Sequence, residues 1–335
     1  MPAGHLCTPS FPQVTSMTPE FNLIATYFTR PTQRATLGVG DDCALIAPAH
    51  GCELAISTDT LVSGTHFFAN ADSFKLGHKA LAVNLSDLAA MGALPRYVTL
   101  ALTLPSINPA WLDEFARGFF ALAESSGVEL IGGDTTRGPL AMTLTVFGEV
   151  AAGKALRRDR GLAGDDIWVS GNLGGAAIAL KHLQESAAIP KEHIESALAC
   201  LHTPIPRNSL GCALVGVANA AIDISDGLIA DLSHICERSG LAAAVNWPTV
   251  PQAPALRSVS PELALTCALA GGDDYELCFT ARENRREEIA TIGNSAGVAL
   301  TRIGKMRAGN PHVTVLDAHG EPMNIPRAGF DHFTP

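Results

Sequence analysis

Six short segments of this chain place aspartate beside glycine, serine or threonine, and these are residue types that bind metal ions and phosphates. The segments read GVGDD (38–42), STDT (57–60), NLSDLAAMGA (84–93), GGDTTRG (132–138), IDISDG (222–227) and GGDDYEL (271–277). Most follow an apolar run, so we expect their carboxylates at strand ends. Carboxylate and hydroxyl oxygens are ligands that hard divalent cations prefer, and such cations often carry phosphates. The pattern favours metal-assisted phosphate chemistry.

Each segment taken alone also has a purely structural explanation. Gly-Asp-Asp is ordinary turn chemistry, STDT suits the end of a strand, and Ser225 or Asp226 alone could cap a helix. Two carboxylates about 4 Å apart repel by roughly 4 kcal/mol at an effective dielectric near 20. The aspartates are therefore either dispersed or neutralised by cations, and the sequence leaves this choice open. Along STDT, strand alternation sends Ser57 and Asp59 to one face and Thr58 to the other.

A predicted helix at residues 74–91 carries one aspartate in an otherwise largely apolar segment. Ala80, Asn84, Asp87 and Met91 are spaced so that they share one face of this helix. A buried carboxylate is costly unless it is paired or coordinates a cation. The pattern predicts that Asp87 is a metal ligand assisted by Asn84, and the alternative is that it caps a neighbouring loop.

Other catalytic motifs are weak or missing. Residues 148–155 nearly match a P-loop, but Ala155 stands where that motif needs serine or threonine. The sequence contains neither a Gly-x-Ser-x-Gly elbow nor a His-Glu-x-x-His motif. His66, taken by itself, is most simply a loop histidine. The sequence thus offers no obvious side-chain nucleophile.

The composition is that of an acidic globular protein. The chain has 335 residues, 47% hydrophobic and 17% charged, with a net charge of −10. It lacks the basic face typical of nucleic-acid binders and an apolar run of about 18 residues that would predict a membrane span. Its eight cysteines are scattered without zinc-site spacing, which favours a reduced cytoplasmic compartment.

Predicted strands and helices alternate along the chain, which indicates an α/β or α+β fold. A shift in composition at residues 151–164 predicts a boundary between two domains of ordinary size. We therefore expect a disordered leader at 1–19, an N-terminal domain at 20–151 and a C-terminal α/β domain at 152–335. We expect a helix at 109–126 and strands at 166–170 and 242–246. Of the other strands, we expect one to end at Ser57 and another, starting at Glu129, to end at Ile131.

The ordered set of motifs resembles the thiamine-monophosphate kinase family, within the superfamily of aminoimidazole ribonucleotide synthetase. The matching strings run in family order over nearly the whole chain: GVGDDCALI, LAISTDTLVSGTHF, KALAVNLSDLAAMGA, LIGGDTTRGPLAMTLTVFGEV, AIDISDGLIADLSHI, GGDDYELCF and GFDHF. The resemblance implies a two-domain fold like that synthetase, in which the N-terminal domain at 20–151 binds ATP and magnesium, and a homodimer in which the N-terminal sheets pair.

The same resemblance implies an activity. It is ATP-dependent phosphorylation of thiamine monophosphate to thiamine diphosphate, the last step of thiamine diphosphate biosynthesis, by direct in-line transfer assisted by Mg²⁺. The partners would be ATP and thiamine monophosphate, with neither nucleic acid nor a membrane involved. Alternatives are another ATP-using enzyme of the superfamily, a Mg²⁺-dependent phosphohydrolase, and a binding module without turnover.

The family's functional positions carry over to matching residues of this chain. The implied metal ligands are Asp42, Ser57, Thr58, Asp59, Asp87, Asp134, Asp223 and Asp226. The implied ATP contacts are Gly133, Asp134, Arg158 and Ser225, and the implied substrate contacts are His66, Asp273 and Phe330. Two positions depart from the family pattern: Asp273 stands where glutamate is frequent, and Phe330 where tyrosine or tryptophan is. Phe330 can still stack on a cationic thiazolium, a contact worth about 0.5–2 kcal/mol.

Overall fold

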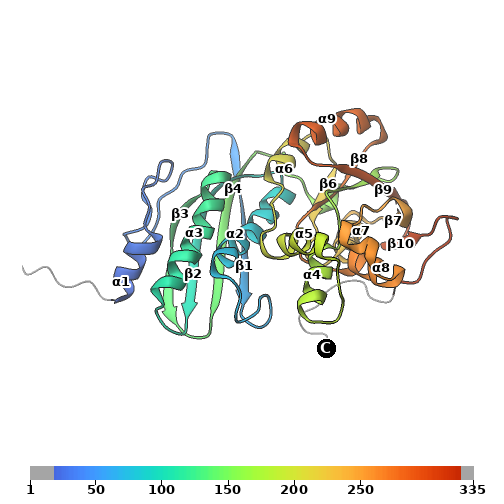
Figure 1. Cartoon of the computed structure of the whole chain (residues 1–335). Coiled ribbons are helices and arrows are strands. Elements are labelled where there is room, and N and C mark those ends of the chain that lie inside the picture. Colours follow the sequence, from blue (N-terminus) through green and yellow to red (C-terminus); the bar gives the residue numbers. More distant parts are fainter. Residues whose placement is uncertain (1–18, 326–335) are drawn as a thin grey trace, which may run out of the picture.

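Two β-sheets, one in each of two α/β domains that lie side by side, organise the protein (Figure 1). The computed structural model describes residues 19–325. The first sheet has the order β1-β4-β2-β3, with β2 and β3 parallel and the other pairs antiparallel. Its strands are β1 (Cys52–Val62), β2 (Leu94–Leu104), β3 (Glu129–Arg137) and β4 (Ala141–Ala151).

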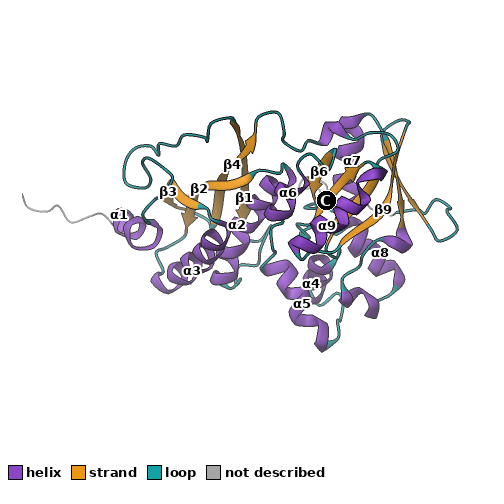
Figure 2. Cartoon of the chain, turned by 90° about the horizontal axis from the view of Figure 1, so that it is seen from above, coloured by secondary structure: helices purple, strands orange, loops and turns teal. Residues whose placement is uncertain are grey.

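Helices cover one face of this first sheet (Figure 2). Leu81 and Leu85 of α2, Phe115 and Phe119 of α3, and alternate residues of the strands such as Leu144 form one buried core. Within the described residues, no helix covers the opposite face. The helices of this domain are α1 (Pro19–Leu23) with a π-helical turn (Ile24–Phe28), α2 (Ser73–Ala90) and α3 (Pro109–Ser126).

The second sheet has the order β10-β7-β9-β5-β8-β6. Only the β10–β7 pair is parallel among its described pairs. Its strands are β5 (Asp166–Ser170), β6 (Ala220–Asp223), β7 (Ala242–Asn246), β8 (Leu277–Ala281), β9 (Leu300–Arg307) and β10 (His312–Leu316).

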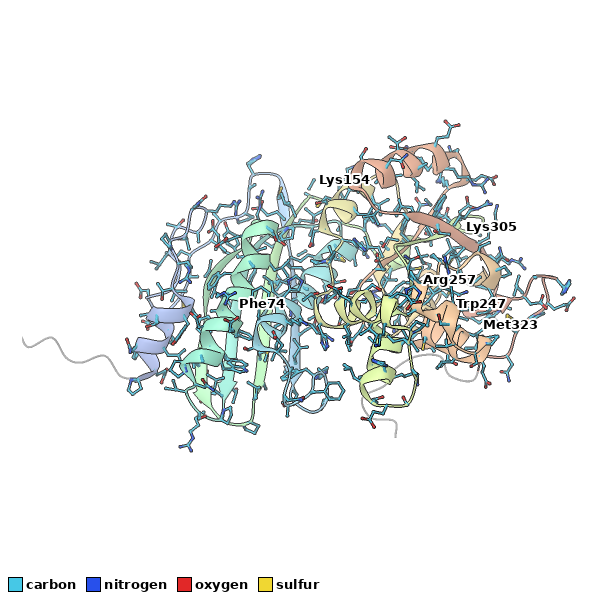
Figure 3. All side chains as sticks on the ribbon, in the orientation of Figure 1. Phe74, Lys154, Trp247, Arg257, Lys305 and Met323 are labelled. Carbon is cyan, nitrogen blue, oxygen red and sulfur yellow. The ribbon has the colours of Figure 1, made fainter. Side chains whose placement is uncertain are left out.

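Helices flank the second sheet on both faces because its strands are apolar on both sides. Along β5, Ile167 and Val169 join a core with α4, α5, α7 and α8, whereas Trp168 between them packs towards α6 and α9. Trp247 and Met323 close the first of these cores at the end remote from the N-terminal domain (Figure 3). The helices are α4 (Gly175–Leu183), α5 (Lys191–His202), α6 (Asn208–Leu214), α7 (Leu228–Ser239), α8 (Pro261–Ala270) and α9 (Arg286–Ala296).

Helix α2 belongs to both domains. Its last residues, Ala89 and Ala90, are buried in the core that α6 and α9 form with the second sheet. A side-chain Cβ at Gly211 of α6 would lie only 2.0 Å from the backbone oxygen of Ala89. Glycine therefore lets the two helices touch through their backbones, and this contact fixes the distance between the domains.

Several expected elements agree with the structure, and two expected strand ends are wrong. The expected helix 109–126 and strands 166–170 and 242–246 match α3, β5 and β7. However, β1 continues past Ser57 to Val62, and β3 past Ile131 to Arg137. Both continue because their backbones keep pairing with β4 and β2. STDT thus lies within β1, and GGDTTRG lies within β3 except for its last residue, Gly138. The expected leader falls almost wholly outside the described residues.

None of the described helices is both long enough and apolar enough to cross a membrane.

The contact between α6 and α2 yields a prediction about stability. Replacing Gly211 by alanine should lower the free energy of unfolding by about 1–3 kcal/mol, because the added Cβ would overlap backbone that cannot move aside. Helix propensity alone predicts the opposite, a gain of about 1 kcal/mol. Urea denaturation would measure the change. Ser209→Ala, at an exposed position of the same helix, is the control and should be nearly neutral.

Candidate active site

A contact between β1 and α2 forms the centre of the candidate site. The Ser57 hydroxyl donates a hydrogen bond to the Asp87 carboxylate. The backbone N–H of Asp59 donates to Oδ1 of Asn84 over 3.1 Å, and this fully buried amide donates in turn to the Ala80 carbonyl. As the alternation predicts, Ser57 and Asp59 turn inward towards the helix. The aspartate-bearing face of α2 therefore meets the STDT strand.

The C-terminal domain adds the carboxylates of Asp223 and Asp226, at the end of β6 and in the loop after it. Asp223 is the last residue of β6, and Ser86 of α2 donates a hydrogen bond to its Oδ2 over 2.7 Å. Asp231 lies on α7, and its Oδ2 accepts the backbone N–H groups of Ser225, Asp226 and Gly227, in the loop between β6 and α7, at 3.0–3.1 Å. Gly227 is the residue before α7. Neither Ser225 nor Asp226 is thus the helix cap, which removes one structural explanation for these residues.

Burial, with contributions from neighbouring carboxylates, raises the pKa values of aspartates at this junction. Burial raises the pKa of Asp59 to about 6, and the charges of Asp87 and Asp226 add to the effect. Burial raises the pKa of Asp223 to about 7, again with a contribution from Asp87. Burial also raises the pKa of Asp87, while Arg158 opposes the increase. We call Asp59, Asp87, Asp223 and Asp226 the carboxylate cluster; added positive charge would stabilise its ionised form.

A cleft of about 940 Å³ opens beside the carboxylate cluster. All four of its aspartates line the cleft, together with Ser225. The remaining walls come from both domains: residues 64–72, the N-terminal part of α2, helices α4 and α8, and residues 271–275. The cleft is therefore bounded by both domains and is large enough for a ligand of nucleotide or cofactor size.

Two of the three expected substrate contacts line the same cleft. His66 accepts a hydrogen bond at Nδ1 from the backbone N–H of Val62 over 3.0 Å. The carboxylate of Asp273 receives one hydrogen bond from Lys79 and one from Tyr275, each 2.9 Å long. The third expected contact, Phe330, lies outside the described residues.

Other expected site residues lie elsewhere on the first sheet. Gly133 and Asp134 are exposed on β3, which β2 and β4 separate from β1. Three strand spacings amount to about 14 Å. A Cβ at Gly133 would lie 1.9 Å from the Leu100 carbonyl oxygen, so glycine is required there for strand packing. The Thr58 hydroxyl pairs with that of Thr145, across β1 and β4.

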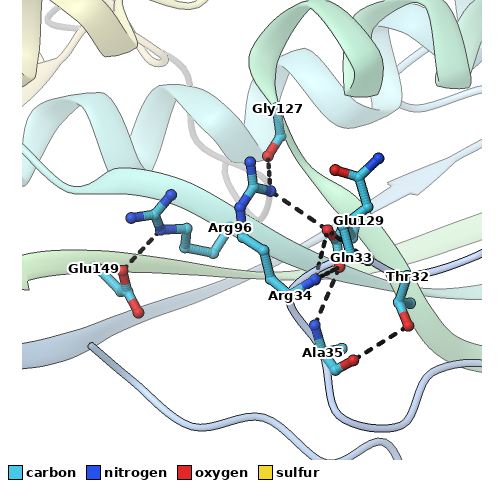
Figure 4. Close-up of polar contacts among 8 residues, drawn as sticks. All are labelled: Thr32, Gln33, Arg34, Ala35, Arg96, Gly127, Glu129 and Glu149. Atoms are coloured by element: carbon cyan, nitrogen blue, oxygen red, sulfur yellow. Dashed lines mark hydrogen bonds and ion pairs between the residues drawn. The ribbon is translucent and has the colours of Figure 1, made fainter. Parts of the chain in front are cut away.

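Asp42 sits on a loop that is anchored at both ends. On one side, Glu129 accepts the backbone N–H of Arg34, and the Arg34 side chain donates to the carbonyl of Gly127 (Figure 4). On the other side, Glu149 accepts the N–H of Ala49 and the side chain of Arg96. Between these anchors Asp42 is exposed. Asp42 thus lies on a loop that is anchored at both ends, and it is not part of the carboxylate cluster.

The carboxylate cluster supplies the donor atoms that could hold a magnesium ion. Within residues 19–325, no three His, Cys, Asp or Glu side chains lie close enough together to form a complete metal site. The cluster nonetheless offers only oxygen donors, which suit Mg²⁺. Mg²⁺ commonly binds through one or two carboxylates and completes its shell with water and substrate phosphates. The residues present fit that mode of binding.

Three residues of the site were missed by reasoning from sequence. Ser86 holds Asp223, Asp231 holds the Ser225–Gly227 loop, and Lys79 holds Asp273. Lys79 did have a signal, because it precedes Asp87 by eight residues and so lies on the same face of an apolar helix. Ser86 and Asp231 look like ordinary helix residues until their partners are known.

Two family models and relatives of known function match most of this chain. The model of the N-terminal domain of AIR synthase related proteins matches residues 40–150, and that of the C-terminal domain matches residues 163–317. The thiamine-monophosphate kinase of Escherichia coli K12 is 47% identical over 319 residues, covering 94% of this chain and 98% of that protein. The chain belongs to the thiamine-monophosphate kinase family.

Solved structures of this family share the fold. The crystal structure of the thiamine-monophosphate kinase from Stenotrophomonas maltophilia K279a is 47% identical, with a TM-score of 0.81 over 90% of this chain and 96% of that chain. AaThiL complexed with AMPPCP and TMP is 27% identical, with a TM-score of 0.75 over 86% of this chain and 89% of that one. The family's fold therefore extends over most of both domains described here.

The carboxylate cluster predicts a distinctive pH dependence of stability. Unfolded aspartates titrate near pH 3.8, whereas folded Asp59 and Asp223 titrate near 6 and 7. The stability that these groups contribute is full below pH 3.8 and is lost as the pH rises to about 7, at up to about 1.4 kcal/mol per pH unit for each group. Urea denaturation in chelator between pH 4.5 and 8 would measure it.

A variant isolates this effect from other titrating groups. Asp223→Asn should lose part of the downward slope, and added Mg²⁺ should stabilise the unaltered protein more at pH 7.5 than at pH 5. Identical slopes for the two proteins would contradict the assignment of a raised pKa to Asp223.

Proposed function

We propose that this chain transfers the γ-phosphoryl group of ATP to the phosphate of thiamine monophosphate, giving ADP and thiamine diphosphate. The observation that carries the proposal is the carboxylate cluster, which both domains build along one cleft. It occurs in a chain 47% identical to a thiamine-monophosphate kinase over nearly its full length. Among the solved relatives, AaThiL has been crystallised with AMPPCP and TMP.

The proposed transfer is direct and in line, and it needs no covalent enzyme intermediate. The acceptor phosphate is itself the nucleophile, so the protein has to position two anionic groups and lower their repulsion. Ser57 orients Asp87, Ser86 orients Asp223, and Asp231 orients the loop with Ser225. Arg158, whose charge acts on Asp87 and Asp223, supplies a fixed positive group near the same point.

Mg²⁺ is the cofactor that we propose. When bound, it would neutralise charge on the phosphates of both ligands. Asp59, Asp87, Asp223 and Asp226 are the residues of this chain that would hold Mg²⁺ ions, one or two carboxylates to each ion, with Ser57 beside them. Thr58 stays a prediction because its hydroxyl pairs with that of Thr145, although the residue lines the cleft. Asp42 and Asp134 stay predictions because, within the described residues of one chain, they lie apart from the cluster. The same holds for the proposed ATP contacts at Gly133 and Asp134.

We assign the remaining roles from places near the cluster or along the cleft. Arg158, whose charge acts on the cluster, and Ser225 are proposed ATP contacts. His66 and Asp273 are proposed acceptor contacts, and Phe330 stays a predicted one. An acidic cleft suits the cationic ring of thiamine monophosphate. The seven cysteines of the described residues are all free, which supports the proposed cytoplasmic location.

We also propose that the open face of the first sheet pairs with a second copy of the chain. This face carries Ile56 and Val62 of β1, which are 58% and 36% exposed, and Phe147 of β4 opposite Ile56. Between them lie the hydroxyl pairs of Thr58 with Thr145 and of Thr60 with Thr143. A sheet with apolar side chains on a face that no helix covers is suited to burial against another sheet.

Light scattering would test the dimer. The unaltered protein should have twice the mass of one chain, and Ile56→Lys should shift it towards the monomer, because a charge would be buried in the paired face. Ile205→Lys, the same change at a position of the C-terminal domain that is 67% exposed, controls for the added charge. A monomeric mass for the unaltered protein would contradict the proposal.

An assay with purified protein tests the activity. With ATP, Mg²⁺ and thiamine monophosphate, chromatography should show ADP and thiamine diphosphate forming together. Asp87→Asn should lower kcat by about a hundredfold or more, because it removes a charge that faces the reacting phosphates. Asp113→Asn, the same change on the exposed side of α3, should leave kcat unaltered.

Two results of this assay would contradict the proposals. Release of inorganic phosphate without thiamine diphosphate would indicate a phosphohydrolase and reject the proposed function. Full activity of a folded Asp87→Asn protein would show that Asp87 has only a structural role.

A further inference from the structure

A partly buried ion pair connects the two domains within the cleft, and the backbone N–H of its acidic member, Asp273, donates to the Ser225 carbonyl over 2.9 Å. Nζ of Lys79, on α2, lies 2.9 Å from Oδ2 of Asp273, which belongs to the loop before β8. The Lys79 side chain is only 6% exposed, whereas that of Asp273 is 33% exposed. The cleft is therefore in contact mainly with the carboxylate, and the ammonium holds that carboxylate from behind.

The backbone around Asp273 is held in an unfavourable conformation. Asp273 and Tyr275 have φ angles of +67° and +49°, the left-handed region that residues other than glycine rarely occupy. The Tyr275 hydroxyl donates to Oδ1 of Asp273 over 2.9 Å, so each carboxylate oxygen has a partner. Such conformations persist when surrounding contacts fix them, and they gather at binding sites.

The spacing along α2 separates Lys79 from Asp87 of the carboxylate cluster. Lys79, Val83 and Asp87 recur every four residues, lie on one face of the helix and all line the cleft. Eight residues of helix correspond to about 12 Å along its axis. The same helix face therefore presents Asp87 at one end, where the phosphates meet, and Lys79 at the other.

We propose that Lys79 is a positioning residue for the acceptor, which fixes the Asp273 carboxylate so that it can bind the cationic part of thiamine monophosphate. This inference rests on the proposed function. The charge of the ligands decides which of them is affected, because ATP has no cationic group for a carboxylate to bind. Without Lys79, the Asp273 carboxylate would keep only its hydrogen bond from Tyr275.

Kinetics of Lys79→Met test the proposal. The KM for thiamine monophosphate should rise about tenfold or more, the loss expected for a buried hydrogen bond to a charged group. The KM for ATP should stay nearly unchanged, and Lys79→Arg should restore part of the acceptor affinity because it keeps the charge. Lys154→Met, at an exposed position outside the cleft, is the matched control and should leave both KM values unaltered.

A double-mutant cycle shows whether Lys79 acts through Asp273. If it does, Lys79→Met should raise the acceptor KM far less in an Asp273→Asn background than in the unaltered chain. If Lys79→Met alone fails to fold, the double variant can be measured instead. It removes both charges and so leaves no unpaired buried ion. In that case the acceptor KM of the double variant should equal that of Asp273→Asn.

Three results would overturn the inference: additive effects of the two changes, an equal rise in the KM for ATP, or an unchanged KM for thiamine monophosphate. All presuppose that the unaltered chain makes thiamine diphosphate. If it does not, the proposed function itself fails, and that result is distinct from a failure of the Lys79 inference.

Discussion

The hydrogen bond from Ser86 to Asp223 is the contact on which the rest of the site depends. Both side chains are buried, and they come from different domains. A carboxylate taken out of water without a partner is expensive, so Asp223 is tolerated at this depth only with α2 in place beside it. The packing of Gly211 against Ala89 sets that position. These contacts therefore set both the relative position of the two domains and the geometry of the carboxylate cluster.

Local patterns in the sequence predicted the parts of the site that depend on local structure. Strand alternation placed Ser57 and Asp59 on one face, and helix spacing placed Asn84 and Asp87 on another. Those two faces meet in the structure. The end of β6 at the IDISDG segment was also predictable, because an apolar run stops there.

Long-range contacts were beyond that reasoning. Ser86 and Asp223 are 137 residues apart, and Lys79 and Asp273 are 194 apart. No local pattern indicates which partner a serine or lysine will find at such a separation. The strand ends were misjudged for a related reason, since continued pairing with β2 and β4 extends β3 and β1 through glycine and threonine residues with weak apolar patterning. Sheet order, likewise invisible to local patterns, decides that Asp134 lies away from Asp59.

The sharing of α2 between the domains also bears on how the chain is made. A ribosome finishes α2 long before it reaches Asp223, and at about 5–20 residues per second the interval is of the order of ten seconds. Throughout that time Ala89 and Ala90 have no partner from α6 or α9, and Ser86 has no acceptor from β6. The nascent N-terminal half therefore passes through a stage in which a largely apolar helix face is uncovered and within reach of chaperones.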